Sequence, residues 1–134
     1  MITLDDYWSS CGKYPLRVKY APPDAETIVN AKKFVECCNA LLVAFTHSRQ
    51  LTSGYRPESV NKKIPGAAKT STHITGEGGD FEDANHHFGS WCLTQIELLK
   101  TLGLFMEDPP STWANGHIHL QTRPTKSGNI VFLP

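Results

Sequence analysis

The stretch that most restricts the fold of this chain is residues 69–83, "KTSTHITGEGGDFED". It contains three glycines within four positions: Gly76, Gly78 and Gly79. Glycine in the interior of a helix or a strand is destabilising, because it loses more conformational freedom on folding than any other residue. We therefore predict a loop rather than a helix or strand. The glycines would let the chain turn back, so that His73 at one end and Asp80 at the other converge on one point.

Two segments that flank this loop have the spacing of amphipathic helices. The first is predicted to begin after an N-cap at Asp24 and to end near His47. Its apolar residues recur at intervals of three and four: Ile28, Ala31, Phe34, Val35, Cys38, Leu41, Leu42 and Phe45. The second is predicted from about His87 to Leu102, with Gly103 as its C-cap. Its inward side would hold Phe88, Trp91, Cys92, Ile96, Leu99 and Leu102.

The remaining segments give weaker signals. Residues 1–23 have no clear period, residues 50–59 indicate a short strand that runs into a loop, and residues 107–116 are typical of turns. Residues 117–123, "HIHLQTR", alternate strictly between polar and apolar side chains and predict a strand. With no repeat and no linker in 134 residues, we expect a single domain over residues 1–134.

On the last strand, His117, His119 and Gln121 would point to one face, and Ile118 and Leu120 into the core. The two imidazoles would lie roughly 7 Å apart along the strand. One of them could bind a metal while the other lies just outside the coordination sphere. Such a pair alone also fits ordinary surface histidines.

The loop adds a complementary set of metal-ligand residues. Zinc binds histidine nitrogens and aspartate oxygens, and a catalytic site uses three protein ligands and leaves the fourth position open. His73, Asp80 and His119 supply two neutral ligands and one anion. The four cysteines have no CxxC spacing, so we expect reduced and mostly buried thiols instead of a cysteine-based zinc site.

The charge balance excludes several classes of protein. Thirteen basic and thirteen acidic residues give a net charge of +0, which leaves no electrostatic footprint for a nucleic acid or an anionic membrane. No segment is long enough to insert into a membrane, and the acidic start "MITLDDYWSS" does not resemble a signal peptide. We expect a cytoplasmic monomer.

Three ordered motifs carry a resemblance to a known family. "SGYRPESVN", then "GAAKTSTHITGEGGD", then "HIHLQ" span residues 53–121. They closely resemble the zinc D-Ala-D-Ala peptidases, whose pattern is SGYR, then SxHxxGxAxD, then a late histidine in a WxH or HxH strand. That family includes D,D-carboxypeptidases, the vancomycin-resistance dipeptidases and the L-alanyl-D-glutamate peptidases of phage endolysins. It shares its metal site with lysostaphin-type peptidases and the Hedgehog signalling domain.

The resemblance implies a role for each matching residue. The zinc ligands would be His73, Asp80 and His119. Arg56 would bind a substrate carboxylate or carbonyl, a task that suits a planar guanidinium. Ser71 would stabilise the substrate-binding site through hydrogen bonds to the residues around the metal, without being a metal ligand itself.

The chain departs from the family pattern at two positions. Gly78 replaces an alanine, which leaves the ligands unchanged. Gly116 stands three residues before the last ligand, where many relatives have an acidic general base. We therefore expect His117 to be the catalytic acid and base, as the first histidine is in the HxH branch of the wider group. Glu107 and Asp108 remain alternatives.

The resemblance implies an α+β fold, with a small antiparallel sheet that bears one zinc ion and helices packed on one side. The function would be hydrolysis of a stem-peptide bond in peptidoglycan. We expect an endopeptidase of the phage or prophage endolysin type, which reaches the cell wall on phage-mediated lysis. Two alternatives remain: a D-Ala-D-Ala carboxypeptidase, and a non-catalytic, zinc-stabilised wall-binding or virion component.

Overall fold

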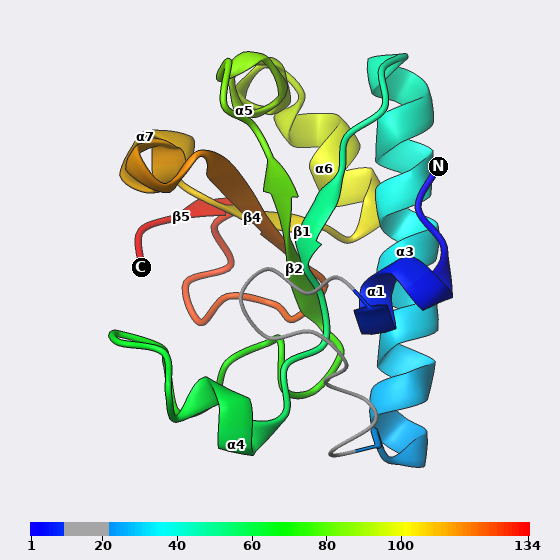
Figure 1. Ribbon diagram of the computed structural model, residues 1–134. Helices are drawn as coiled ribbons and strands as arrows, with labels where there is room; N and C mark the ends of the chain where they lie inside the picture. The colour runs from blue at the N-terminus through cyan, green and yellow to red at the C-terminus, as the bar shows by residue number, and fades with distance from the viewer. Residues whose placement is uncertain (10–21) are drawn as a thin grey trace.

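A sheet of five short strands lies at the centre of the protein, in the order β1-β2-β4-β3-β5 (Figure 1). The computed structural model describes residues 1–9 and 22–134. The strands are β1 (Leu51–Ser53), β2 (Gly78–Glu82), β3 (Phe105–Glu107), β4 (His117–Gln121) and β5 (Val131–Phe132). Together with the helices they form an α+β architecture, as predicted from the sequence.

The sheet is mixed, so the prediction of a purely antiparallel sheet is wrong at one edge. All neighbouring strands pair antiparallel except β3 and β5, which are parallel. The chain reverses direction after β4, as it would in a hairpin, but β3 already occupies the place beside β4. The returning strand β5 therefore pairs on the far side of β3. Both strands are too short to give a clear alternation in the sequence.

The first predicted helix is confirmed as α3 (Ala25–Phe45). The Asp24 carboxylate accepts a hydrogen bond of 2.8 Å from the backbone N–H of Thr27, the usual geometry of an N-cap. The helix ends at Thr46, which takes a left-handed conformation with φ 66°. The predicted apolar stripe is buried at Ala31, Phe34, Val35, Cys38, Leu41 and Leu42.

The second predicted helix is interrupted. It forms α5 (His87–Leu93) and α6 (Ile96–Leu102), and the predicted C-cap Gly103 has φ 73°. The Thr94 hydroxyl donates to the carbonyl of Trp91 at 2.7 Å, an oxygen that Gln95 would use in a continuous helix. The N–H of Gln95 instead bonds to Cys92, three residues back. Competition from a short polar side chain explains this break.

Four further short elements were not predicted. They are α1 (Leu4–Ser9), α4 (Glu58–Asn61), α7 (Pro109–Thr112) and the 3₁₀ helix η1 (Trp113–Asn115). The last two replace the turn expected over residues 107–116. A proline at the first position of α7 presets a helical φ there, so a segment rich in turn residues forms a single helical turn.

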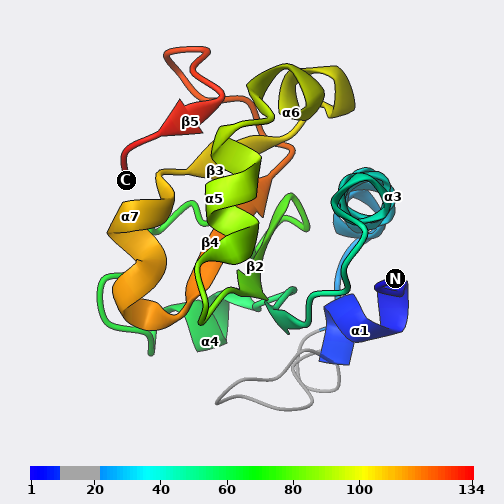
Figure 2. The same cartoon turned by 90° about the horizontal axis from the view of Figure 1, so that it is seen from above.

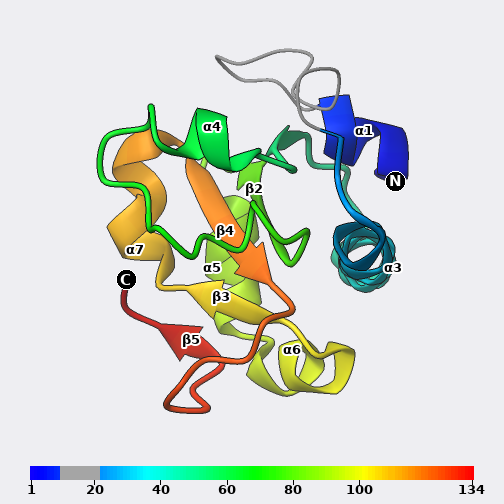
Figure 3. The same ribbon diagram turned by 90° about the horizontal axis from the view of Figure 1, so that it is seen from below.

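The longer helices cover the face of the sheet opposite the histidines. The ring of Phe81 on β2 lies 6.4 Å from that of Phe34 on α3 and 6.1 Å from that of Phe88 on α5. Ile118 and Leu120 of β4 are fully buried, as predicted. Seen from above, α5 and α3 stand over this side of the sheet (Figure 2). Seen from below, the segment that contains α4 crosses the other face (Figure 3).

The glycine-rich stretch differs most from the prediction, because Gly78 and Gly79 lie within strand β2. Their role is close packing. A Cβ at Gly79 would lie 3.0 Å from the ring of Phe34, and one at Gly78 only 2.1 Å from the hydroxyl of Thr72. Of the three glycines in this stretch, only Gly76 has a left-handed conformation that favours glycine, with φ +78°.

The N-terminal helix is fastened to the same strand. The buried hydroxyl of Tyr7 donates to the carbonyl of Gly78 at 2.7 Å, and burial raises the pKa of Tyr7. The predicted free thiols are confirmed at Cys37, Cys38 and Cys92, whereas Cys11 lies outside the described residues. No helix among the described residues is both long and apolar enough to cross a membrane.

The space around Gly76 generates a stability prediction. A Cβ there would lie 2.4 Å from the backbone carbonyl of Thr27, whereas Gly103 has a similar φ and nothing within 4 Å. Gly103→Ala should cost roughly 1–2 kcal/mol, the penalty of a left-handed conformation. Gly76→Ala should cost about 1–3 kcal/mol more, because backbone must also move. Urea unfolding of both variants in excess chelator measures the difference. Equal losses in the free energy of unfolding of the two variants would show that the close approach of Gly76 to α3 does not add to the cost of the substitution.

Candidate metal centre

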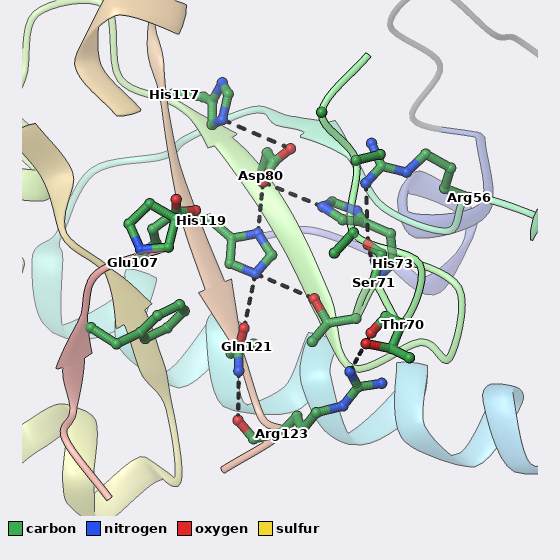
Figure 4. A pocket seen from close by; sticks show the side chains of 16 residues that line it. Arg56, Thr70, Ser71, His73, Asp80, Glu107, His117, His119, Gln121 and Arg123 are labelled. Atoms are coloured by element: carbon green, nitrogen blue, oxygen red, sulfur yellow. Dashed lines mark hydrogen bonds and ion pairs between the residues drawn. The ribbon is translucent and has the colours of Figure 1, made fainter. Parts of the chain in front are cut away.

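Three of the predicted residues converge at the floor of a cleft (Figure 4). One potential ligand atom from each of His73, Asp80 and His119 lies within 4.8 Å of the others. Asp80 Oδ1 lies 2.8 Å from His119 Nδ1 and 3.5 Å from His73 Nε2. Asp80 on β2 is directly opposite His119 on β4, so strand pairing itself brings these two side chains together.

The third side chain, His73, is held by the backbone of the preceding segment. Its Nδ1 lies 2.8 Å from the carbonyl oxygen of Gly54. Because a carbonyl only accepts, Nδ1 carries the proton and Nε2 presents a lone pair to Asp80. The backbone N–H of Arg56 also donates to the backbone carbonyl of His73 at 3.0 Å. The SGYR segment therefore sets both the position and the tautomer of this imidazole.

His73 is buried, Asp80 and His119 have 15% and 11% of their side chains exposed, and burial and charge act on all three in opposite directions. Burial alone would raise the pKa of Asp80, but the two imidazoles beside it hold it well below its usual range. Burial lowers the pKa of His73, and Asp80 only partly offsets this. Burial would lower the pKa of His119 as well, but the adjacent carboxylate of Asp80 raises it. The cluster is thus a buried carboxylate with two imidazoles around it.

This donor set fits zinc. Neutral His73 and ionised Asp80 face each other as two hydrogen-bond acceptors, a contact that becomes favourable when a cation lies between them. Tetrahedral zinc with bonds of about 2.0–2.1 Å separates its ligand atoms by roughly 3.3 Å. The 2.8 and 3.5 Å contacts of Asp80 bracket that separation.

Arg56 and Ser71 form a connected pair at one side of the cluster. The Arg56 guanidinium donates to the Ser71 hydroxyl at 3.2 Å, and that hydroxyl oxygen also accepts from the backbone N–H of His73 at 3.2 Å. Burial lowers the pKa of Arg56, while nearby Asp80 opposes the shift. The Arg56 Nε is buried and has no hydrogen-bond partner among the described residues. The guanidinium is therefore held beside the cluster, where Arg56 lines the cleft.

His117 lies on the same strand face as His119 but outside the cluster. Its Nε2 is 4.0 Å from Asp80 Oδ2, and 26% of its side chain is exposed. Of the two acidic alternatives, Glu107 lines the cleft, and burial raises its pKa. Asp108 instead precedes α7, and its backbone N–H donates to Phe132. The structure thus leaves His117 and Glu107 next to the cluster.

The cleft has a volume of about 490 Å³ and extends to both sides of the cluster. Arg56 and Ser71 lie on one side, and Glu107 lies on the other (Figure 4). Phe132 of β5 also lines the cleft.

Several contributors were not assigned a role from the sequence. They are the Gly54 carbonyl, Thr72, Gln121, Arg123 and Phe132. Only Gln121 had a usable signal, because the alternation of β4 already places it on the face of the two histidines. The others act through backbone atoms or come from segments without a pattern. The rings of Tyr55 and Trp113 pack against those of Trp8 and His86, respectively.

A buried cluster of two histidines and one aspartate at a cleft floor is typical of mononuclear metal sites that keep one position open. The sequence model described as Peptidase M15 matches residues 18–121, and the chain therefore belongs to the peptidase M15 family. This is a family of zinc-dependent metallopeptidases, which agrees with the His/Asp/His cluster. Searches of the curated proteins and of the solved structures found no match.

The geometry generates a metal-binding prediction. The wild type should bind one zinc per chain, and alanine at His73, Asp80 or His119 should abolish stoichiometric binding, because two ligands cannot hold the ion in a buried site. Elemental analysis of the purified proteins measures this. The matched control is His117→Ala on the same strand face, which should keep its zinc. Full occupancy in Asp80→Ala or His119→Ala would contradict the ligand assignment.

Proposed function

We propose that this protein is a zinc peptidase that hydrolyses a bond in the stem peptide of peptidoglycan. The observation that carries the proposal is the convergence of His73, Asp80 and His119 at the floor of an open cleft, with Arg56 beside them. Membership of the peptidase M15 family supports the reaction class, and the three ordered motifs support the substrate.

The position of each residue in the cleft would determine its role, either metal binding or substrate binding. His73, Asp80 and His119 hold the metal. Zinc in such a site supplies activation of water and polarisation of the scissile carbonyl. The Ser71 hydroxyl fixes the guanidinium of Arg56, which lines the cleft and can pair with a substrate carboxylate.

His117 would act as the acid and base. Its partly exposed imidazole can take a proton from the attacking water and later give it to the leaving amine. The 4.0 Å contact with Asp80 keeps the ring directed towards the cluster without making it part of the ligand set.

Removing this imidazole tests its role. His117→Ala should keep its zinc and lose roughly 10²–10⁴-fold in rate, the usual contribution of a positioned acid or base. The measurement is the rate of release of new amino groups from purified peptidoglycan at equal zinc occupancy. Glu107→Gln is the matched variant at the other candidate. If the large loss appears in Glu107→Gln and not in His117→Ala, the roles are reversed.

We further propose an internal cut, as in an endolysin-type endopeptidase. The cleft continues beyond the metal cluster on both sides, from Arg56 to Phe132, which leaves room for residues on both sides of the scissile bond. A terminal cut is the second candidate, because the guanidinium of Arg56 in the cleft would also suit the C-terminal carboxylate of the stem.

Analysis of the products separates these possibilities. Mass spectrometry of peptidoglycan treated with the protein should show new amino termini within the stem peptide, and chelator should abolish them. Release of free D-alanine alone would make the protein a carboxypeptidase. No hydrolysis by protein with one bound zinc, together with binding to peptidoglycan, would make it a non-catalytic, zinc-stabilised component.

A further inference from the structure

We propose that Gln121 is a positioning residue that sets the tautomer of His119 and, through it, the affinity of the metal site. This inference rests on the metal site of the proposed function. Gln121 is the last residue of β4, and its side chain lies on the same face as His119 (Figure 4). Its Oε1 lies 3.2 Å from His119 Nε2, on the side of the ring away from Asp80.

The orientation of the Gln121 amide follows from its second contact. Its Nε2 donates to the backbone carbonyl of Arg123 at 2.8 Å. A carbonyl accepts only, so the nitrogen of the amide must face Arg123 and the oxygen must face His119. Gln121 as a residue is 8% exposed, which leaves water little opportunity to replace either contact.

Arg123, whose backbone carbonyl accepts from the Gln121 amide, is itself held in place by its side chain. The guanidinium of Arg123 donates to the carboxylate of Glu77, the hydroxyl of Thr75 and the carbonyl of Thr70. These bonds tie the end of β4 to the loop that carries His73.

The tautomer of His119 follows from the amide. Both ring nitrogens of His119 face groups that only accept, the amide oxygen of Gln121 at Nε2 and the carboxylate of Asp80 at Nδ1. When a cation lies between Nδ1 and Asp80, the proton of neutral His119 must therefore lie on Nε2, where the amide oxygen accepts it. The other nitrogen, Nδ1, then presents its lone pair to the metal cluster, 2.8 Å from Asp80 Oδ1. Gln121 thus does for His119 what the Gly54 carbonyl does for His73.

Thr72 is the competing explanation. Its hydroxyl oxygen lies 3.3 Å from His119 Nε2, in space that is open only because position 78 is glycine. A hydroxyl can donate as well as accept, so Thr72 is compatible with either tautomer. Thr72 can therefore accept a hydrogen bond in the tautomer of His119 that Gln121 requires, but Thr72 alone does not determine which nitrogen is protonated.

The experiment compares the zinc dissociation constants of three variants with that of the wild type, by competition with a chromophoric chelator. Gln121→Met keeps the size of the side chain and removes the acceptor, so affinity should fall roughly 10–100-fold. Gln121→Glu keeps an acceptor oxygen for His119 but loses the donor to the Arg123 carbonyl, so its affinity should lie between those of Gln121→Met and the wild type. Thr72→Val should weaken binding less than Gln121→Met. Gln121→Met with wild-type affinity, or Gln121→Glu as weak as Gln121→Met, would overturn the proposal.

A spectroscopic measurement separates positioning from a general loss of structure. In the zinc-loaded wild type, nitrogen-15 spectra of labelled histidine should show a protonated Nε2 at His119 that exchanges slowly with solvent. In Gln121→Met this exchange should accelerate while the signals of His73 stay unchanged. Unchanged exchange at His119 would overturn the proposal. A wild type that binds no zinc would overturn the proposed function itself, whereas zinc bound equally by the wild type and Gln121→Met would overturn only this inference.

Discussion

The antiparallel pairing of β2 with β4 is the constraint on which the site depends. It places Asp80 opposite His119, while Phe81 and Ile118, the next residues along each strand, turn to the opposite face and enter the core. Because side chains alternate along a strand, a slip of one residue would send the histidines into the core and the apolar side chains into the cleft. The burial of Phe81, Ile118 and Leu120 therefore fixes the register that brings an anion and an imidazole together.

The remaining parts of the site are oriented from outside this strand pair by hydrogen-bond acceptors. The Gly54 carbonyl holds His73, the Gln121 amide holds His119, and the Ser71 hydroxyl links Arg56 to the backbone of His73. Each acceptor fixes where a proton or a donor can lie, which leaves one lone pair of each imidazole for the cluster. Such surrounding hydrogen bonds raise ligand basicity and determine ring orientation, so they affect metal affinity as directly as ligand identity does.

The sequence predicted those parts of the fold that depend on local periodicity. The spacing of apolar residues predicted α3 and its cap at Asp24, and the alternation of β4 placed His117, His119 and Gln121 on one face. It failed where tertiary contacts override local preference. Glycines predicted a loop at Gly78 and Gly79, yet both lie in strand β2, which pairs with β4, at positions where Thr72 and Phe34 leave no room for side chains. The strand β5 and the break at Thr94 depend on a strand order and a side-chain hydrogen bond that no periodicity reports.

Gly76 links the site to the first turn of α3, and this has a consequence for the set of metal ligands. The loop that bears His73 touches the helix where Gly76 meets Thr27, and the Asn30 amide donates to the carbonyl of Thr75 at 3.1 Å. One ligand is in place only when the helix is docked, and the other two only when β2 and β4 are paired. The complete set of three ligands therefore depends on two contacts outside the cluster, the docking of the loop on α3 and the pairing of β2 with β4.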